Sequence, residues 1–190
     1  MAESVIQKAN ARLKFLYRKK DYLTQHTKQL LVMSLVQCHF DYACSVWYNG
    51  LTQSLKHKLQ VTQNKLIRFI LDLKPRDHVG HQQFESLNWL PVNKRVEQVM
   101  LCHVFKVKHK LAPSYMNSFL VSQNTVHSYS TRLSEKGGFN LPKAKGSGCK
   151  SFSFIGAKLW NNLPCHLTDI NNFQSFKVAI KSHLLNSSTF

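Results

Sequence analysis

Acidic residues are scarce in this chain, and the few that it has are spread far apart. Only nine Asp and Glu occur among 190 residues, and no two of them are adjacent. Enzymes that transfer nucleotidyl or phosphoryl groups with two Mg²⁺ ions need closely placed carboxylates to hold both metals. The nearest acidic pair, Asp72 and Asp77, flanks Pro75, where we expect helix-end and turn chemistry. We therefore expect no catalytic site, no metal site and no cofactor.

Cysteine is also sparse and shows no pairing pattern. The five cysteines are irregularly spaced, and an odd number argues against a disulfide framework, which favours a reducing compartment. A zinc site would need pairs of Cys or His at matched spacing, and the chain offers no such set. A Cys–His nucleophile built from Cys38 and His39 is disfavoured because adjacent side chains of a helix point apart.

Long apolar runs are absent as well. The longest apolar stretch, residues 30–36, is interrupted by Ser34 and is far too short to cross a bilayer. No apolar segment typical of a secretory signal peptide occurs near the N-terminus. Residues 1–20 are basic and amphipathic, which weakly resembles a mitochondrial transit peptide, but a basic surface helix is the favoured interpretation. We expect an intracellular protein, nuclear or cytoplasmic, that is not secreted and has no membrane partner.

Residues 145–151 resemble a phosphate-binding loop only at first sight. That motif needs a glycine immediately before the lysine and another five residues earlier. Cys149 and Ala144 occupy these positions, so we reject a nucleotide site and expect only a basic loop.

What the chain has in excess is positive charge. It carries 26 Lys and Arg, and its formal net charge is +17 at pH 7. Such an imbalance destabilises a compact fold by self-repulsion unless an anionic partner offsets it, and nucleic acid is the leading candidate. An anionic membrane surface or an acidic protein comes second, and for any single helix a solvated surface is the alternative. Because phosphate binding needs cations along one surface, the candidate contacts are Arg12, Lys14, Arg18, Lys19, Lys56, Lys65 and Arg68.

Apolar periodicity predicts the fold class. Hydrophobic residues make up 43% of the chain, enough for a core. Their spacing predicts longer helices over about 4–20, 24–42, 52–71, 91–110 and 172–185, and shorter ones near 81–87, 113–120 and 155–161. Thr24 or Thr27, Thr52 and Asn172 suit the first positions of three of them. The predicted fold is mainly α, a bundle-like set of helices with little sheet.

The composition changes at Val121. Residues 121–150 are rich in Ser, Thr, Asn, Gly and Lys and indicate a long basic loop, with at most one short hairpin between 139–141 and 150–154. A loop of this length is unusual inside one compact unit. We therefore predict a helical domain over 1–120, a linker over 121–150 and a small C-terminal helical cap over 151–190.

The aromatic residues allow two interpretations. Trp47, Trp89 and Trp160 could stack on nucleic-acid bases. Each lies in an apolar string beside turn signals, and core packing is the favoured interpretation for all three. For Tyr48 the choice stays open.

An ordered set of short strings runs through most of the chain. The string Gly-Ala-Lys-Leu-Trp-Asn-Asn-Leu-Pro at 156–164 is followed by Ser-Phe-Lys at 175–177. Before it stand Phe-Asp-Tyr at 40–42 with Trp47, residues 59–65 with Arg68, Leu-Asn-Trp-Leu-Pro-Val at 87–92 with Arg95, and Leu-Ala-Pro-Ser-Tyr at 111–115. In this order the strings resemble the C-terminal part of the reverse transcriptase of jockey-like non-LTR retrotransposons (long interspersed elements). The resemblance covers about residues 9–185.

The resemblance implies the thumb and post-thumb region of an RNA-directed DNA polymerase, whose catalytic palm lies upstream of the matched part. Residues 1–120 would then be a thumb that follows the backbone of a template–primer duplex, largely without reading sequence. The family's Gln-Asn-Lys…Arg string adds Gln63 and Asn64, which could bond sugar or phosphate oxygens or cap a neighbouring backbone group.

We therefore expect a non-catalytic, nucleic-acid-binding fragment of a reverse transcriptase that lacks the palm active site. RNA or DNA is the expected partner, and an upstream palm is a further candidate. The alternative is an adopted or decaying host-encoded helical interaction module with no nucleic-acid role.

Overall fold

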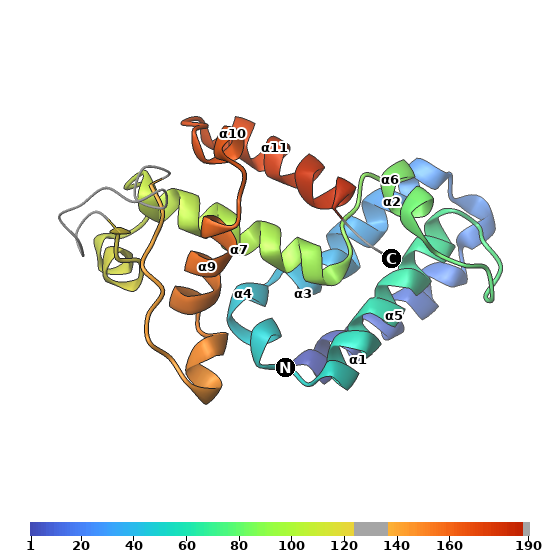
Figure 1. Ribbon diagram of the computed structural model, residues 1–190. Helices are drawn as coiled ribbons and strands as arrows, with labels where there is room; N and C mark the ends of the chain where they lie inside the picture. The colour runs from blue at the N-terminus through green and yellow to red at the C-terminus, as the bar shows by residue number, and fades with distance from the viewer. Residues whose placement is uncertain (124–136, 188–190) are drawn as a thin grey trace. The chain divides into compact units, whose positions relative to one another are not determined.

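The computed structural model describes residues 1–123 and 137–187 of the chain. Within these ranges the protein is mainly helical, as predicted, and its strand-like pairing is limited to an isolated antiparallel bridge between Ser122 and Phe139. The chain groups into two compact units, Met1–Val96 with Ser187–Phe190, and Glu97–Asn186 (Figure 1). We call them the first unit and the second unit.

The first unit contains, in chain order, α1 (Ala2–Tyr17), η1 (Lys20–Tyr22), α2 (Gln25–Val32), η2 (Met33–Gln37), α3 (Cys38–Asp41), α4 (Cys44–Trp47), η3 (Tyr48–Gly50), α5 (Gln53–Ile70), α6 (His81–Ser86) and the start of α7 (Val92–Lys108). Two predicted caps are confirmed. The Thr24 and Thr52 hydroxyls accept hydrogen bonds from the backbone N–H groups of Thr27 and Leu55, at 3.3 and 3.4 Å. Such bonds satisfy backbone donors that a helix start leaves without partners.

The helix predicted over 24–42 forms with an irregular middle. Between α2 and α3, η2 is π-helical, so its backbone hydrogen bonds are displaced by one residue from the α-helical pattern. Two side chains bond carbonyls of this stretch. The Arg12 guanidinium of α1 donates to the Leu35 carbonyl, and the Ser34 hydroxyl donates to the Leu30 carbonyl at 2.9 Å. The bond from Arg12 ties α1 to this irregular turn.

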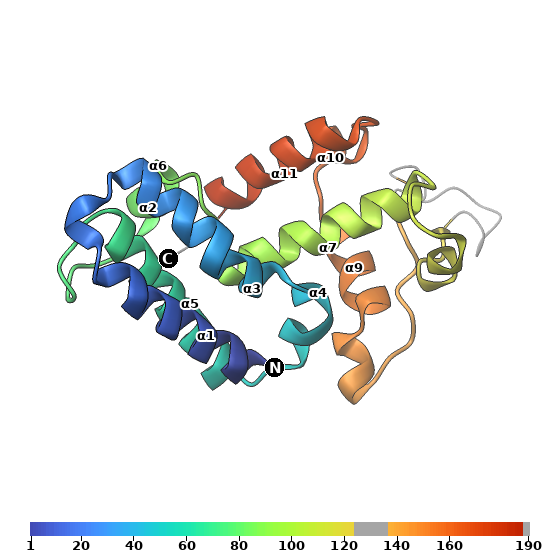
Figure 2. The same ribbon diagram turned by 180° about the vertical axis from the view of Figure 1, so that it is seen from behind.

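The core of the first unit is centred on α5. Leu59, Leu66 and Ile67 of this helix are fully buried, and both α1 and α2 pack against it. Tyr17 and Phe69, each close to the C-terminal end of its helix, meet edge to face with ring centroids 4.9 Å apart. The ends of α1 and α5 therefore lie together, and the two helices run side by side in the same direction (Figure 2).

Two of the motif strings have structural roles in the first unit. The Arg95 guanidinium forms a two-pronged ion pair with Asp41, at 3.0 and 2.9 Å, which joins α3 to the first turns of α7. The Trp47 indole N–H donates to the Tyr42 carbonyl at 2.9 Å and fixes the turn between α3 and α4. Asp41, Trp47 and Arg95 of the motif strings therefore have structural roles within the first unit.

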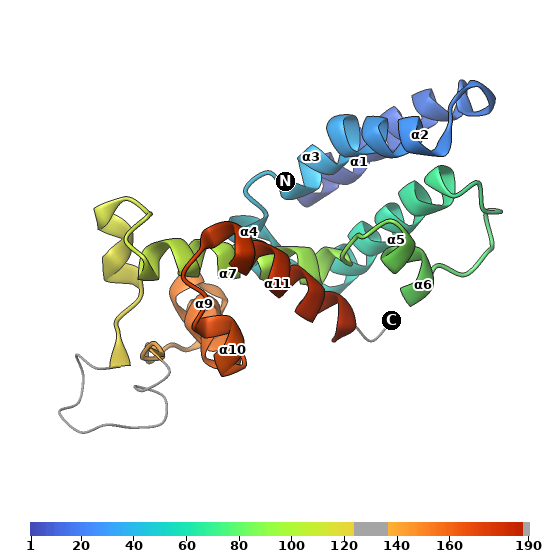
Figure 3. The ribbon, with the colours of Figure 1, turned by 90° about the horizontal axis from the view of Figure 1, so that it is seen from above.

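The second unit is built around the rest of α7. It also contains η4 (Ser114–Phe119), η6 (Gly146–Lys150), α9 (Phe152–Asn161), α10 (Cys165–Thr168) and α11 (Phe173–Asn186). Figure 3 shows α9 and α11 beside α7. Asn172 caps α11 as predicted, because its side-chain oxygen accepts from the backbone N–H groups of Gln174 and Ser175, at 2.9 and 3.1 Å.

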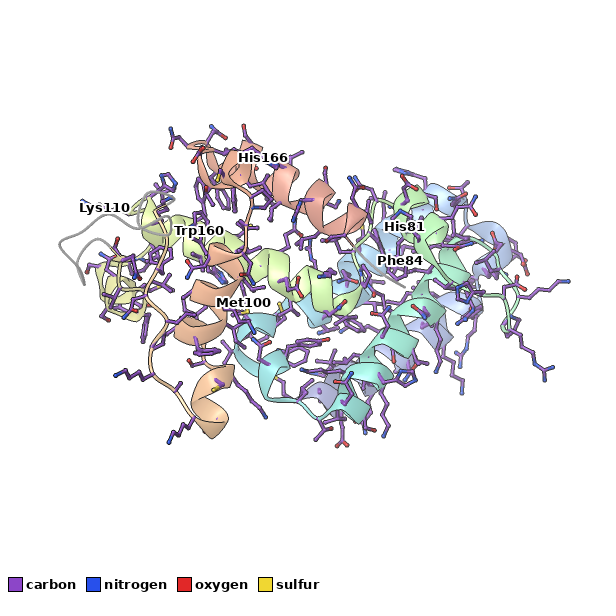
Figure 4. The ribbon with its side chains drawn as sticks, in the orientation of Figure 1. His81, Phe84, Met100, Lys110, Trp160 and His166 are labelled. Carbon is purple, nitrogen blue, oxygen red and sulfur yellow. The ribbon has the colours of Figure 1, made fainter. Side chains whose placement is uncertain are left out.

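Aromatic rings form the centre of the second unit. Phe105 of α7 stacks on Phe176 of α11 with centroids 4.5 Å apart, and Trp160 of α9 lies 5.7 Å from Phe176. Phe139 meets Trp160 edge to face at 6.1 Å. Trp160, labelled in Figure 4, is 1% exposed. The tryptophan of the C-terminal string is thus a core residue.

Two other residues of that string have equally specific contacts. A Cβ atom at Gly156 would lie 3.0 Å from Cγ2 of Val104, so glycine permits the close approach of α9 to α7. The Asn161 side chain bonds both the N–H and the carbonyl of Phe139, at 2.9 and 2.8 Å. The string therefore holds α9, α7 and the segment around Phe139 together.

The predicted hairpin is wrong in its pairing. Phe139 lies opposite Ser122, with a bond from Asn140 N–H to the Val121 carbonyl at 2.8 Å. Residues 150–154 instead complete η6 and begin α9, where the Ser151 hydroxyl accepts from Phe154 N–H at 3.3 Å. This cap starts the helix three residues earlier than predicted. The 113–120 segment is a 3₁₀-helix (η4), and residues 124–136 of the predicted loop lie outside the described residues.

The predicted domain boundaries at residues 121 and 150 stay a prediction. Contacts within the chain place residues 97–120 in the second unit, together with the segments around α9 and α11. The single helix α7, predicted as part of the first domain, contributes to both units.

Candidate nucleic-acid interface

The basic residues of α1 fall on two sides of the helix. Lys14 and Arg18 are four residues apart and share one exposed side, whereas Lys8 and Arg12 share another. The buried residues of α1, which include Ala9 and Leu16, lie opposite Lys14 and Arg18. These two cations therefore point away from the core of the first unit.

A similar arrangement exists on α5. Lys58 and Lys65 are seven residues apart, two helical turns, and both are exposed. Arg68 follows on an adjoining side, half-buried, and its Nε donates to the Asp77 carbonyl at 3.0 Å. No acidic residue occurs within α5, so these cations have no counter-charge on their own helix.

The contact between α1 and α5 brings the two sets together. Lys14 lies one turn before Tyr17, and Lys65 lies one turn before Phe69, so both lysines are neighbours of the ring pair that joins the helices. We call Lys14, Arg18, Lys58, Lys65 and Arg68 the cationic face. Cations spread over two parallel helices can contact several phosphates of one backbone at once.

Among the described residues, four acids lie near the ends of α1 and α5: Glu3, Asp21, Asp72 and Asp77. Glu3 is in the first turn of α1. At the other end, Asp72 follows α5 and pairs with Lys20 and Lys28, and the Asp77 carboxylate accepts from Lys74 N–H at 2.7 Å. The middle of the face is therefore free to attract anions.

Gln63, predicted as a nucleic-acid contact, does not reach the surface. It is 1% exposed, donates to the Leu90 carbonyl at 2.9 Å and accepts from the Gln60 side chain at 3.0 Å. Gln63 therefore has the alternative role, because it bonds a backbone carbonyl that lies next to it in space. Asn64 is half-buried and accepts from the same Gln60 amide at 2.9 Å. The sequence prediction fails at Gln63 because helical spacing alone does not reveal which polar side chain a distant loop covers.

Three other predicted cations lie apart from the cationic face. Arg12 bonds the Leu35 carbonyl on the α2 side of α1. The half-buried Lys56 places its ammonium over the Tyr48 ring, 5.1 Å from the centroid. Lys19 is exposed in the turn that follows α1. The contacts of Arg12 and Lys56 thus direct them away from Lys14, Lys65 and Arg68, whereas Lys19 follows Arg18 directly in the chain.

Sequence reasoning missed Lys58. The spacing of seven residues between Lys58 and Lys65 was visible in the sequence and places both on one side of a helix. The structure shows that both side chains are exposed on α5. Lys20 was missed as well, and its pairing with Asp72 at 3.0 Å depends on a residue 52 positions away, which no local pattern indicates.

The tryptophans are not base-stacking platforms. Core packing is confirmed for Trp89 and Trp160, which are buried, and Tyr48 is buried as well. Trp47 is half-buried, and its N–H is bonded to the backbone. Stacking on Trp89, Trp160 or Tyr48 would require these rings to leave the core, whereas Phe15 of α1 is 60% exposed.

The cysteines and possible metal ligands of the described residues can be compared with known kinds of site. All five cysteines are free, and burial raises the pKa of the Cys44 thiol to about 11, so that it stays protonated. Among the described residues, no three His, Cys, Asp or Glu side chains are placed to hold a metal ion. None of the helices in these ranges has both the length and the apolar character to cross a membrane.

Comparisons of the chain with protein-family models, with curated proteins and with solved structures found no match.

Proposed function

We propose that this chain binds RNA or DNA through the cationic face of its first unit and catalyses no reaction, as a thumb and post-thumb part of a retrotransposon reverse transcriptase would. The ordered sequence strings and the net charge of +17 support the family origin and the anionic partner. The observation that supports the proposal is the exposure of Lys14, Arg18, Lys58 and Lys65 on two helices whose ends are joined by the contact of Tyr17 with Phe69.

The spacing of these cations suits a phosphate backbone. Lys58 and Lys65 stand seven residues apart on α5, which is about 10 Å along the helix axis. One strand of a duplex carries a phosphate about every 3.4 Å of helix axis, so this distance spans about three phosphates. Contacts of this kind position a duplex but do not read its sequence.

A salt titration tests the proposal. Binding of a labelled duplex and of a single strand is measured by fluorescence anisotropy at rising NaCl concentration. We expect micromolar binding that weakens steeply with salt, because each phosphate contact releases a counterion. Absence of binding to either nucleic acid at low salt would rule the proposal out.

A pair of single substitutions locates the interface. Lys58→Gln removes a charge from the cationic face, and Lys8→Gln removes the same charge from the other side of α1. We expect Lys58→Gln to lower the salt slope by about 0.9, the value of one duplex phosphate contact, and Lys8→Gln to leave the slope unchanged. Equal effects would mean that only net charge matters.

Exposed apolar side chains favour a second candidate, an interaction module without a nucleic-acid role. Phe15 on α1 and Leu30 and Met33 on the α2–η2 stretch are 60%, 53% and 48% exposed. Exposed apolar surface of this kind is typical of protein–protein contact. Light scattering distinguishes the candidates: a chain that oligomerises and shows no affinity for nucleic acid supports the second.

A further inference from the structure

A cluster of charges closes one end of the cationic face. The Lys28 ammonium lies 2.7 Å from both carboxylate oxygens of Asp72, and the Lys20 ammonium lies 3.0 Å from one of them. The Lys28 side chain is 4% exposed, whereas those of Lys20 and Asp72 are 29% and 50% exposed. A buried cation thus points at an anion position that is open to solvent and occupied by the chain's own carboxylate.

The backbone at Asp72 is unusual. Its φ of 54° is in the left-handed region, which glycine and asparagine adopt more readily than aspartate. The residue stands just beyond α5, where Leu73 N–H bonds back to the Arg68 carbonyl at 3.0 Å, a usual place for glycine. The two ion pairs give the acid a structural role at a position that otherwise suits glycine.

The cluster adjoins the cationic face through Tyr17. Burial, the largest effect, raises the pKa of the Tyr17 hydroxyl, while Lys20 and Arg68 act to lower it and Asp72 to raise it. Geometry supports the same link, because the Lys28 ammonium lies 5.9 Å from the centroid of the Phe69 ring on which Tyr17 packs, and Leu73, next to Asp72, bonds the carbonyl of Arg68, a residue of the cationic face. A phosphate that contacts Arg68 would approach the Asp72 carboxylate and the Lys20 ammonium.

We propose that Asp72 is an internal counter-ion that competes with nucleic-acid phosphates for Lys20 and so limits affinity at this end of the cationic face. The inference rests on the proposed function and adds a residue that regulates it. An arriving phosphate replaces the carboxylate as the partner of the half-buried Lys20, while the buried Lys28 keeps Asp72. The carboxylate also repels a phosphate bound at Arg68, so its removal strengthens both contacts.

The first test compares two substitutions that each remove one negative charge. Asparagine at position 72 keeps an oxygen for Lys28 and accepts the left-handed backbone. Glu85→Gln is the control, since Glu85 is 64% exposed on α6 and pairs with His81 at 3.9 Å. We expect Asp72→Asn to tighten duplex binding threefold or more beyond the control, and to steepen the salt slope by about 0.9. Equal gains from both variants would overturn the inference.

The second test asks whether Asp72 shields Lys20, by changing Lys20 in the wild-type chain and in the Asp72→Asn variant. In the wild-type chain we expect Lys20→Gln to alter duplex affinity little, because Lys20 is already paired, whereas Lys14→Gln of the cationic face weakens binding. In the Asp72→Asn background, Lys20→Gln is expected to cancel the gain in affinity. If Lys20→Gln weakens the wild-type chain as much as Lys14→Gln does, Asp72 does not shield Lys20 and the inference fails.

The outcomes separate this inference from the proposed function. A wild-type chain that binds no duplex refutes both. A wild-type chain that binds with a steep salt slope, but responds to Asp72→Asn as it does to Glu85→Gln, refutes the counter-ion alone.

Discussion

At the scale of single residues, polar side chains that are candidate ligand contacts or motif residues in the sequence bond the protein's own backbone. Gln63 donates to the Leu90 carbonyl, Arg12 to the Leu35 carbonyl and Asn161 to the Phe139 carbonyl. Each accepting carbonyl lies in a loop or in an irregular turn, outside regular α-helical bonding. A buried carbonyl without a partner is costly, so Gln63 and Asn161 stabilise places where the chain leaves regular helices, while the bond from Arg12 lies at the surface.

Gln63 allows this role to be measured. Its replacement by Ala removes the bond to the Leu90 carbonyl and leaves a space in the core, so we expect the free energy of unfolding to fall by about 2–3 kcal/mol. Gln53→Ala, at the exposed start of the same helix, is expected to change it by less than about 0.5 kcal/mol. Urea denaturation gives both values. Weaker duplex binding with unchanged stability would restore Gln63 as a nucleic-acid contact.

Asp72 makes a pH-dependent contribution to stability. Its hydrogen bonds from Lys28, the largest effect, lower the pKa of the folded carboxyl below the ordinary value of 3.8. A depressed carboxyl pKa stabilises the fold above the unfolded pKa, and this contribution disappears as the pH falls through the folded value. We expect the free energy of unfolding of the wild-type chain to decrease as the pH falls below 3.8. The Asp72→Asn variant should lack the share of this decrease that comes from Asp72.

The histidines supply an internal control for the same titration. Burial lowers the pKa of His103 from 6.5, so His103 costs stability as the pH falls below 6.5, and Asp72→Asn should leave that step unchanged. Denaturation midpoints measured from about pH 7 to about pH 2.5 separate the two steps. An identical loss below pH 3.8 in both chains would contradict the role of Asp72.

At the scale of elements, the positions of the helices could be predicted from the sequence, because apolar periodicity and Thr or Asn caps act locally. The π-helical turn at Met33–Gln37 could not, since it has no local composition signal. The pairing of Phe139 with Ser122 also depends on segments that are distant in the sequence. An excess of cations on these helices could be predicted from the sequence, but the side on which each cation lies could not, because it depends on the contact between α1 and α5.

The contact between α9 and α7 depends on the absence of a side chain at Gly156. Alanine favours a helix over glycine by about 1 kcal/mol, but its Cβ would lie 3.0 Å from Cγ2 of the fully buried Val104. We expect the clash to dominate, so that Gly156→Ala lowers the free energy of unfolding by about 1–2 kcal/mol. Chemical denaturation followed by circular dichroism measures the change.

A double substitution isolates the steric cause. Val104→Ala removes the methyl group that the new Cβ of Gly156→Ala would meet, so the two changes together should cost less than the sum of their separate costs, by about 1 kcal/mol. Strict additivity would show that the glycine is needed for another reason.

At the scale of the whole molecule, positive charge is present in both units but is used differently. In the second unit, the Lys106 and Lys108 ammonium groups lie over the rings of Phe173 and Trp160, at 4.8 and 4.9 Å from the centroids. Burial also lowers the pKa of Lys108. These two lysines take part in the packing of their own unit, whereas Lys14, Lys58 and Lys65 of the cationic face are exposed. The cost of self-repulsion should therefore be greatest on the cationic face.

This difference predicts how salt affects stability. The range of repulsion shrinks from about 30 Å at 0.01 M salt to about 8 Å at 0.15 M, so the melting temperature should rise with NaCl over this range. A triple variant in which Lys14, Lys58 and Lys65 are replaced by Gln should have a higher melting temperature at about 0.01 M salt than the wild-type chain. Its melting temperature should also depend less on salt. The control changes three exposed lysines from separate helices, Lys8, Lys158 and Lys177. It removes the same charge but less mutual repulsion, because clustered cations repel more strongly than scattered ones. Calorimetry measures the melting temperature of both triple variants at each salt concentration. Equal changes in both variants would show that the positive charge is spread evenly. The surface on which nucleic-acid binding is proposed would then lose its physical basis.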